Sequence, residues 1–308
     1  MTPDGPPAVP LRRRLGWAAE LLAARSLLAL FRSLGPERAS NLGGALCALL
    51  GPLLPVSRVA DANLRLALPE LDRAARRRVV RQVWDNLGRT VAEFPHLATL
   101  RRDTPTGPGW SVQGGEILDR QRGIGGPVLF VSGHIGNWEM LPPAVAHHGL
   151  RFASFYRAAG NPLVDRLIRR LRDDAIGGGT PLFAKGAKGA RAALTHVLRG
   201  GSLGMLVDQK MNDGIEARLF GLPAMTAPAL AAIALKRRCP VIPGRVERLG
   251  PARLRLVVEP PLPLPDSGDR VADQAALTQQ INDLLERWIR AAPGSWLWLH
   301  RRWPRSLY

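Results

Sequence analysis

The sequence of 308 residues is poor in several residue types, and each shortage excludes a class of site. It has only two cysteines, Cys47 and Cys239, and both stand in apolar surroundings. This predicts buried thiols in a reducing compartment, and neither a disulfide framework nor a cysteine metal site. Acidic residues are also scarce, since 25 Asp and Glu face 43 Lys and Arg, for a net charge of +18. Such a charge favours nucleic acid, an anionic lipid surface or an acidic carrier protein as partner, and by itself does not choose among them.

Uninterrupted hydrophobic runs are missing as well. A membrane-spanning helix needs about 20 apolar residues with few charges, whereas Glu20, Arg25 and Arg32 interrupt the apolar N-terminal stretch Leu15–Leu34. The basic residues Arg12–Arg14 ahead of a leucine-rich face suit an amphipathic helix that lies in an anionic membrane interface. A helix that simply packs on its own domain fits the same pattern. We expect peripheral attachment to the membrane rather than a spanning helix.

The order of predicted elements indicates the fold class. Residues 11 to about 100 are expected to be helical, with a break at Pro69 and Asp72 as the N-cap of the helix that follows. Predicted strands and helices then alternate, which is typical of an α/β sheet with helices on both faces. We predict one α/β domain, residues 101–308, with a central mostly parallel or mixed sheet. Residues 1–100 would form an N-terminal helical, membrane-associating extension. The predicted strands are PVLFVS, RFASFYR, SLGMLVDQ, PVIPGRVERL and ARLRLVVEP, with helices at 162–174, 187–199 and 227–238 and a last helix after residue 270.

The stretch VSGHIGNWEM, residues 131–140, is the first candidate site. It follows a predicted strand, and the carboxyl ends of strands are where open α/β sheets place their ligands. With His134 in the turn and Glu139 in the first helical turn, the carboxylate could reach the imidazole. A carboxylate on one ring nitrogen fixes the tautomer and makes the other nitrogen a general base. The same residues would also suit a capping histidine and a glutamate at a helix start.

Two other motifs compete with this site and fail on their context. GGSLG, residues 200–204, has the Gly-x-Ser-x-Gly form of a serine hydrolase. A nucleophile elbow needs a strand before the serine and a helix after it. Here the predicted helix precedes Ser202 and the strand follows, so we expect a turn residue. No His, Cys, Asp or Glu spacing is typical of a metal site, and no phosphate loop is complete, so no metal and no cofactor are predicted.

Six ordered blocks then make the sequence resemble the late acyltransferases of lipid A biosynthesis, the lauroyl/myristoyl transferase family with a His-x4-Glu variant of the lysophospholipid acyltransferase motif. In two positions the chain departs from that pattern: Ala158 stands where many members have proline, and Gly294–Ser295 stands in place of a common Glu-Gln pair. The blocks are ANLRLALPEL with WDNLGRTVAEF, SGHIGNWE, YRAAGNPLVDRLI, GMLVDQKMNDGIEARLFGLPAMTAPALAAIAL, CPVIPGRV, and APGSWLWLHRRWP.

The resemblance implies a reaction and a set of site residues. An acyl chain would move from an acyl carrier protein thioester to a hydroxyl of a lipid A precursor, with His134 as general base oriented by Glu139. Arg157 is the candidate donor to the oxyanion or to a lipid phosphate. Asn161, Asp208 and Gln209, in the Asn-Pro and Asp-Gln blocks, are the other candidate substrate-binding residues, and no role is assigned to Asp208.

The resemblance also implies a location and leaves alternatives open. The expected place is the cytoplasmic face of the cell inner membrane, with the anionic membrane surface as a partner and attachment that is peripheral or through the N-terminus. An acyltransferase acting on another membrane glycolipid or an aminolipid remains a rival, as does a basic membrane-binding protein without catalysis. Nucleic acid is not expected, because no recognisable binding motif accompanies the charge.

Overall fold

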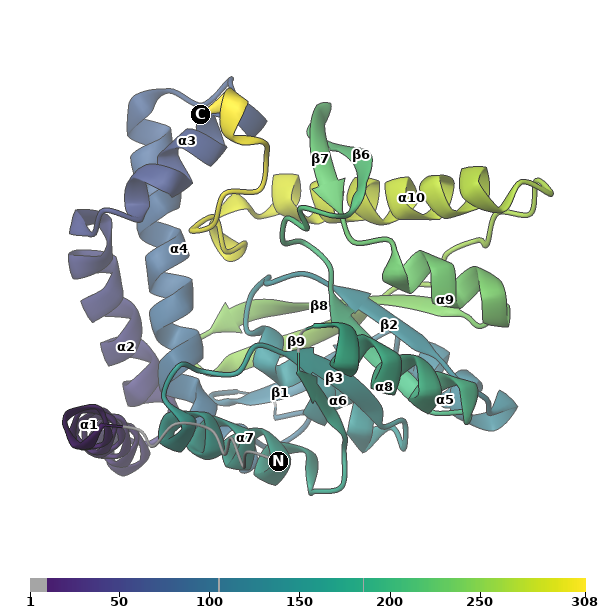
Figure 1. Ribbon diagram of the computed structural model, residues 1–308. Coiled ribbons are helices and arrows are strands. Elements are labelled where there is room, and N and C mark those ends of the chain that lie inside the picture. Colours follow the sequence, from purple (N-terminus) through teal and green to yellow (C-terminus); the bar gives the residue numbers. More distant parts are fainter. Residues whose placement is uncertain (1–9, 105, 185) are drawn as a thin grey trace, which may run out of the picture.

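Four helices form the N-terminal part of the protein, in a computed structural model that describes residues 10–104, 106–184 and 186–308. The predicted helical character of this region and its N-cap are confirmed, because Asp72 accepts a hydrogen bond from the backbone N–H of Ala75. α2 and α4 cross where Gly43 meets Gly88, and a Cβ on Gly88 would lie 2.1 Å from the Gly43 carbonyl oxygen. Glycine at the crossing therefore lets the two helix backbones touch (Figure 1). The helices are α1 (Leu11–Leu34), α2 (Pro36–Leu50), α3 (Ser57–Ala67) and α4 (Arg73–Glu93), with short 3-10 turns η1 (Gly51–Leu53) and η2 (Phe94–His96).

A seven-stranded sheet forms the centre of the molecule, in the order β1-β9-β8-β2-β5-β3-β4. Every neighbouring pair is parallel except β8 and β9, which are antiparallel. The prediction of a mostly parallel or mixed sheet flanked by helices is thus confirmed, and all five predicted strands are present. The strands are β1 (Gly109–Gln113), β2 (Leu129–Ser132), β3 (Phe152–Tyr156), β4 (Leu182–Ala184), β5 (Ser202–Leu206), β8 (Val241–Gly250) and β9 (Arg253–Val258).

Helices cover both faces of this sheet, and each face has its own apolar core. Alternate residues of β2 point to opposite sides: Phe130 packs with α5 and α6, while Leu129 and Val131 pack with α8, α9 and α10. β2 is buried on both faces, which is why it reads as a continuous apolar run. The helices are α5 (Gly115–Ile124), α6 (Leu141–His147), α7 (Pro162–Ile176), α8 (Ala187–Leu198), α9 (Ala229–Arg237) and α10 (Arg270–Ala291).

A separate hairpin and the C-terminal segment complete the fold at the end of the molecule that carries α3 and the C-terminus (Figure 1). The hairpin strands β6 (Ile215–Leu219) and β7 (Leu222–Thr226) pair only with each other. Arg302, which is fully buried, donates hydrogen bonds to the Met225 carbonyl at 2.9 Å and to the Thr226 hydroxyl at 2.7 Å. Burial lowers the pKa of the Arg302 guanidinium to about 10. The C-terminal segment is therefore tied to the hairpin through the protein interior.

One bent pair of helices has the length and composition that a membrane span requires. Among the residues that the structure describes, no single helix is long and apolar enough to cross a membrane. The consecutive segments Pro36–Leu53 and Ser57–Ala67 reach that length and composition together, and they are bent by 84° at their junction.

Candidate functional site

His134 lies in the turn that follows β2, at the carboxyl end of the sheet. Asp208 lies beside His134 in space and follows β5, the strand that pairs in parallel with β2. Since parallel neighbours end at the same edge, residues 74 positions apart in sequence meet there. The turn needs glycine at position 136, where φ is +58° and a Cβ would lie 1.9 Å from the Val246 carbonyl oxygen.

Asp208 is the carboxylate that holds the imidazole. Its Oδ1 lies 2.8 Å from His134 Nδ1, and its Oδ2 accepts from the His134 backbone N–H at 2.8 Å. The indole N–H of Trp296 donates to the same Oδ2 at 2.7 Å. Burial of Asp208 by itself would raise its pKa, but the charge of His134 and the hydrogen bonds from it keep the pKa well below the usual range for an aspartate. An ionised carboxylate only accepts, so Nδ1 carries a proton, and in the neutral tautomer of the imidazole the lone pair is on Nε2.

The structure differs here from the pairing expected from sequence. Glu139 contacts Arg172 of α7, not the imidazole: the guanidinium donates from Nε to Oε2 at 2.9 Å and from Nη2 to Oε1 at 2.7 Å. The turn after Asn137 continues as the 3-10 turn η3 (Trp138–Met140), which directs Glu139 toward α7. Burial alone would lower the pKa of Arg172, yet the hydrogen bond and the charge of Glu139 raise it above its ordinary value. Glu139 therefore forms a two-bond ion pair, and Asp208 takes the orienting position.

A large cavity of about 900 Å³ opens beside these residues. His134 lines it with a side chain that is 17% exposed, and Glu139 and Arg172 line it as well. Trp138 contacts the imidazole edge-on, with ring centroids 5.1 Å apart. The rest of the wall is largely apolar and comes from both the sheet and its covering helices; examples are Phe130, Val145, Phe152, Leu256 and Val258. The cavity thus joins a titratable group to a largely apolar compartment.

The structure gathers most of the other residues singled out in the sequence. Arg157, just after β3, and Gln209 line the cavity, while Asp208 lies buried beneath it. Asn161 is elsewhere, because its side-chain oxygen caps α7 by accepting from the Leu163 N–H at 2.9 Å. Its amide group donates to the Trp17 carbonyl and to Glu20 of α1, both at 2.9 Å. The expected substrate contact at Asn161 is replaced by a helix cap and a tie between α7 and α1.

Comparison with known families agrees with this geometry. The sequence model described as bacterial lipid A biosynthesis acyltransferase matches residues 15–305, almost the whole chain. The chain belongs to this family. No curated protein matches the sequence. The family identifies the protein as an acyltransferase of lipid A biosynthesis.

In this acyltransferase the C-terminal segment holds the turn that carries His134. The backbone N–H of Leu297 donates to the His134 carbonyl, and the N–H of Gly136 donates to the Ser295 carbonyl, both at 3.0 Å. Ile135 and Trp296 form the antiparallel bridge between them. Ser295 thus contacts the turn through its backbone, so the departure from the common Glu-Gln pair at 294–295 leaves this contact in place.

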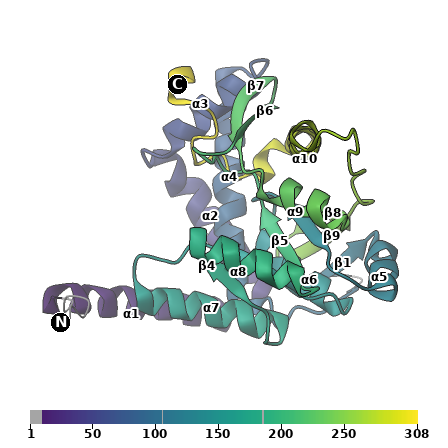
Figure 2. The same cartoon turned by 45° about the vertical axis from the view of Figure 1, so that its right-hand side comes forward.

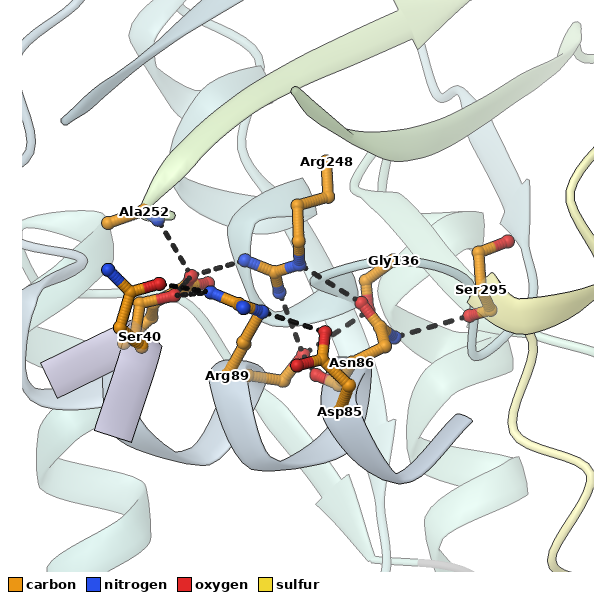
Figure 3. Close-up of polar contacts among 11 residues, drawn as sticks. Ser40, Asp85, Asn86, Arg89, Gly136, Arg248, Ala252 and Ser295 are labelled. Atoms are coloured by element: carbon orange, nitrogen blue, oxygen red, sulfur yellow. Dashed lines mark hydrogen bonds and ion pairs between the residues drawn. The ribbon is translucent and has the colours of Figure 1, made fainter. Parts of the chain in front are cut away.

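Helix α4 supports the same turn from the other side with a buried polar network (Figure 3). The amide of Asn86 donates to the Gly136 carbonyl at 3.0 Å and to the Ser295 carbonyl at 3.3 Å. Glu93, which is fully buried, accepts from the Asn137 amide at 2.7 Å and forms an ion pair with Arg248 of β8. Arg248 in turn donates to Asn86 at 3.2 Å. The turn is therefore held by polar groups from α4, the sheet and the C-terminal segment.

Among the residues described, no group of three or more His, Cys, Asp or Glu side chains is arranged to hold a metal ion.

Ser202 has a structural role, because it begins β5 and its buried hydroxyl accepts from the Val128 N–H at 3.1 Å. The predicted order, with a helix before this serine and a strand after the helix, is confirmed and does not fit a nucleophile elbow. The expectation of a turn residue was wrong, because Ser202 is the first residue of β5. Arg172 was missed from sequence because nothing in the local pattern of α7 distinguishes it from the arginines beside it.

Proposed function

We propose that the protein transfers a fatty acyl chain from an acyl carrier protein thioester to a hydroxyl group of a lipid A precursor. The observation that carries the proposal is the hydrogen bond between His134 Nδ1 and the buried Asp208, which leaves Nε2 free at the cavity. In the reaction Nε2 removes the proton of the acceptor hydroxyl as its oxygen attacks the thioester carbonyl carbon. Asp208 stabilises the imidazolium that forms, and such general base catalysis contributes about 10²–10⁴-fold.

The second half of the reaction completes the balance of atoms and charge. The tetrahedral oxyanion collapses, the carbon–sulfur bond breaks, and the carrier thiolate leaves with the proton that His134 had taken. The oxyanion needs N–H or cationic donors. Among the described residues, the cations at the cavity wall are Arg157, Arg172 and Lys210, and the two arginines are the candidate donors. Glu139 contributes by fixing the guanidinium plane of Arg172 through two hydrogen bonds.

The apolar compartment suits the acyl chain. Each buried methylene contributes about 0.8 kcal/mol of transfer free energy. The binding free energy of a chain enclosed by Phe130, Phe152 and Val145 would therefore depend mainly on the number of its methylene groups. The headgroup of the lipid and the carrier protein would stay outside this apolar compartment. This division keeps the reacting carbonyl near His134 while the hydrocarbon leaves water.

We further propose that the enzyme works from the cytoplasmic face of the inner membrane, attached through its N-terminal helices. α1 exposes leucines along its length, and the turn between α2 and α3 exposes more. Arg12–Arg14 lie at the start of α1, where Arg13 stacks over Trp17 at 5.1 Å. Exposed leucines beside arginines are the composition of a helix that lies in an anionic interface. The exposed leucines are Leu11, Leu15, Leu22, Leu27 and Leu30 on α1, and Leu46, Leu49, Leu50, Leu53 and Leu54 near the turn.

An acyl transfer assay on the purified protein tests the proposal. Wild type mixed with an acyl carrier protein thioester and a lipid A precursor should add one acyl chain to the lipid, detected by mass spectrometry. His134→Ala should abolish most transfer while circular dichroism and thermal unfolding stay as in wild type. Transfer by His134→Ala at the wild-type rate would contradict the proposal, and a product formed only with another glycolipid or an aminolipid would correct the acceptor.

A further inference from the structure

A second cleft lies between α1 and α7, and its volume is about 740 Å³. α7 separates it from the catalytic cavity. Residues of a helix advance by about 100° each, so Arg170 and Arg172 point to nearly opposite sides of α7. Arg172 accordingly lines the catalytic cavity, whereas Arg166 and Arg170 line the second cleft, and Leu182 lines both. Figure 2 shows α1 extending from the body of the molecule beside α7.

The cleft is strongly basic. Arg25 of α1 and Arg166, Arg169 and Arg170 of α7 line it, all with exposed side chains, and the carboxylate at its wall is that of Asp173. Within residues 10–104, 106–184 and 186–308, none of these four arginines forms an ion pair. Four cations facing one carboxylate leave a positive field in a concave space, which attracts an anion.

Other features of the cleft point to a lipid headgroup. Leucines of both helices form its apolar wall, and α1, which exposes leucines to its surroundings, is one of its two sides. The hydroxyl oxygen of Thr180 at the wall is enclosed and has no hydrogen-bond partner in the described part of the chain. Such an oxygen is satisfied when a bound group supplies its partner. Arg169 also stacks on the Tyr156 ring at 5.7 Å, and Tyr156 lines the catalytic cavity.

We propose that this cleft binds a phosphate group of the acceptor lipid and so positions its hydroxyl for transfer at His134. The proposal rests on the proposed function, because it assigns a binding site to the phosphate of the same acceptor lipid. Guanidinium groups recognise phosphate through paired, charge-assisted hydrogen bonds. The size of the cleft suits a headgroup, since small-ligand sites occupy about 300–1,000 Å³, whereas a stable protein partner needs an interface of about 1,200 Å² or more.

Steady-state kinetics in neutral detergent micelles test the proposal. The acceptor is offered as the phosphorylated lipid and as the same lipid after phosphatase treatment, with an acyl carrier protein thioester as donor. In the double variant Arg166→Gln/Arg170→Gln the KM for the phosphorylated acceptor should rise roughly 10- to 100-fold, as expected for lost charge-assisted bonds. The KM for the thioester should stay within twofold, and wild type should prefer the phosphorylated acceptor.

The matched control is Arg77→Gln/Arg78→Gln, two exposed neighbouring arginines of α4, which removes the same charge and should leave both KM values unchanged. The proposal would be overturned if the double variant raised the KM of both acceptors equally or raised no KM at all. A rise only in the KM of the thioester would also overturn it, because the cleft would then bind the carrier protein. Equal competition by phosphatidylglycerol or by inorganic phosphate would also overturn it, by showing a site for any membrane or free phosphate. Absence of transfer in wild type would instead refute the proposed function.

Discussion

At the scale of single residues, His300 shows how the interior beside the buried Asp208 carboxylate responds to pH. It stacks edge-on against Trp296, with centroids 5.6 Å apart, and neither ring nitrogen meets hydrogen-bond geometry with another described residue. Burial lowers the pKa of His300, and the neighbouring Asp208 charge only partly opposes this. The imidazole is therefore held in its neutral form in the folded protein.

This makes the free energy of unfolding depend on pH in a defined direction. Because the unfolded chain binds the proton near the ordinary histidine pKa of about 6.5, stability is fully present above that pH and is lost as the pH falls through the lower folded pKa. His300→Phe keeps an aromatic ring at this position but cannot take up a proton. Urea unfolding between pH 7 and pH 5 should show a smaller loss of stability in this variant, by up to about 1.4 kcal/mol per pH unit. If the free energy of unfolding changed with pH equally in the variant and in wild type, His300 would not take up a proton on unfolding.

At the scale of elements, the predicted parts of the fold are those with local signals. β2 is a short apolar run and β8 begins with one, Val241–Pro243. The end of α3 and the cap of α4 are set by Pro69 and Asp72. The strands β1 and β4 were not predicted, because they lie at the two edges of the sheet and are only partly buried. The hairpin β6–β7 was missed although β6 carries a local strand signal: its residues Ile215–Leu219 alternate between apolar and polar, and their burial alternates in the same way.

The candidate site was predicted in the same partial way. His134 and the cavity residues Arg157 and Gln209 follow strands, so their position was visible in sequence. The partners of His134 and Glu139 were not visible, because Asp208 and Arg172 come from elements 74 and 33 residues away. A local motif therefore located His134, while strand order determined which carboxylate contacts its ring.

The support that α4 gives to the turn carrying His134 leads to a prediction for kcat. Asn86→Ala removes the amide that donates to both Gly136 and Ser295. Displacements near 1 Å can cost about 10²-fold in rate, so kcat should fall roughly 10- to 100-fold while the acceptor KM changes little. Stopped assays at saturating substrates measure this. The control Asn41→Ala, on the exposed side of α2 and bonded to Arg89, should keep the wild-type kcat; a drop in the control equal to that of Asn86→Ala would contradict a specific support of the turn.

At the scale of the whole molecule, charge and apolar exposure should act together in membrane attachment. Each basic residue near an anionic surface contributes about 1 kcal/mol. Arg12→Gln/Arg13→Gln/Arg14→Gln should therefore weaken binding to phosphatidylglycerol vesicles about 100-fold in sedimentation assays at low salt. The control Arg73→Gln/Arg77→Gln/Arg78→Gln on α4 carries the same charge change, and these arginines are exposed as well. High salt should release much of the wild type, because it screens this attraction; extraction that needs detergent under every wash would contradict peripheral attachment.

The central claim is that Asp208 orients His134 as the general base, and Asp208→Asn tests it most directly. Three N–H groups converge on the two carboxylate oxygens of Asp208, and an asparagine of the same size offers only one acceptor oxygen. The acyl transfer rate at saturating substrates should fall roughly 10²- to 10⁴-fold, with the acceptor KM near the wild-type value. Asp266→Asn, an exposed aspartate paired with Arg238, should transfer at the wild-type rate. An Asp208→Asn protein that is folded and transfers acyl chains within threefold of wild type would contradict the account.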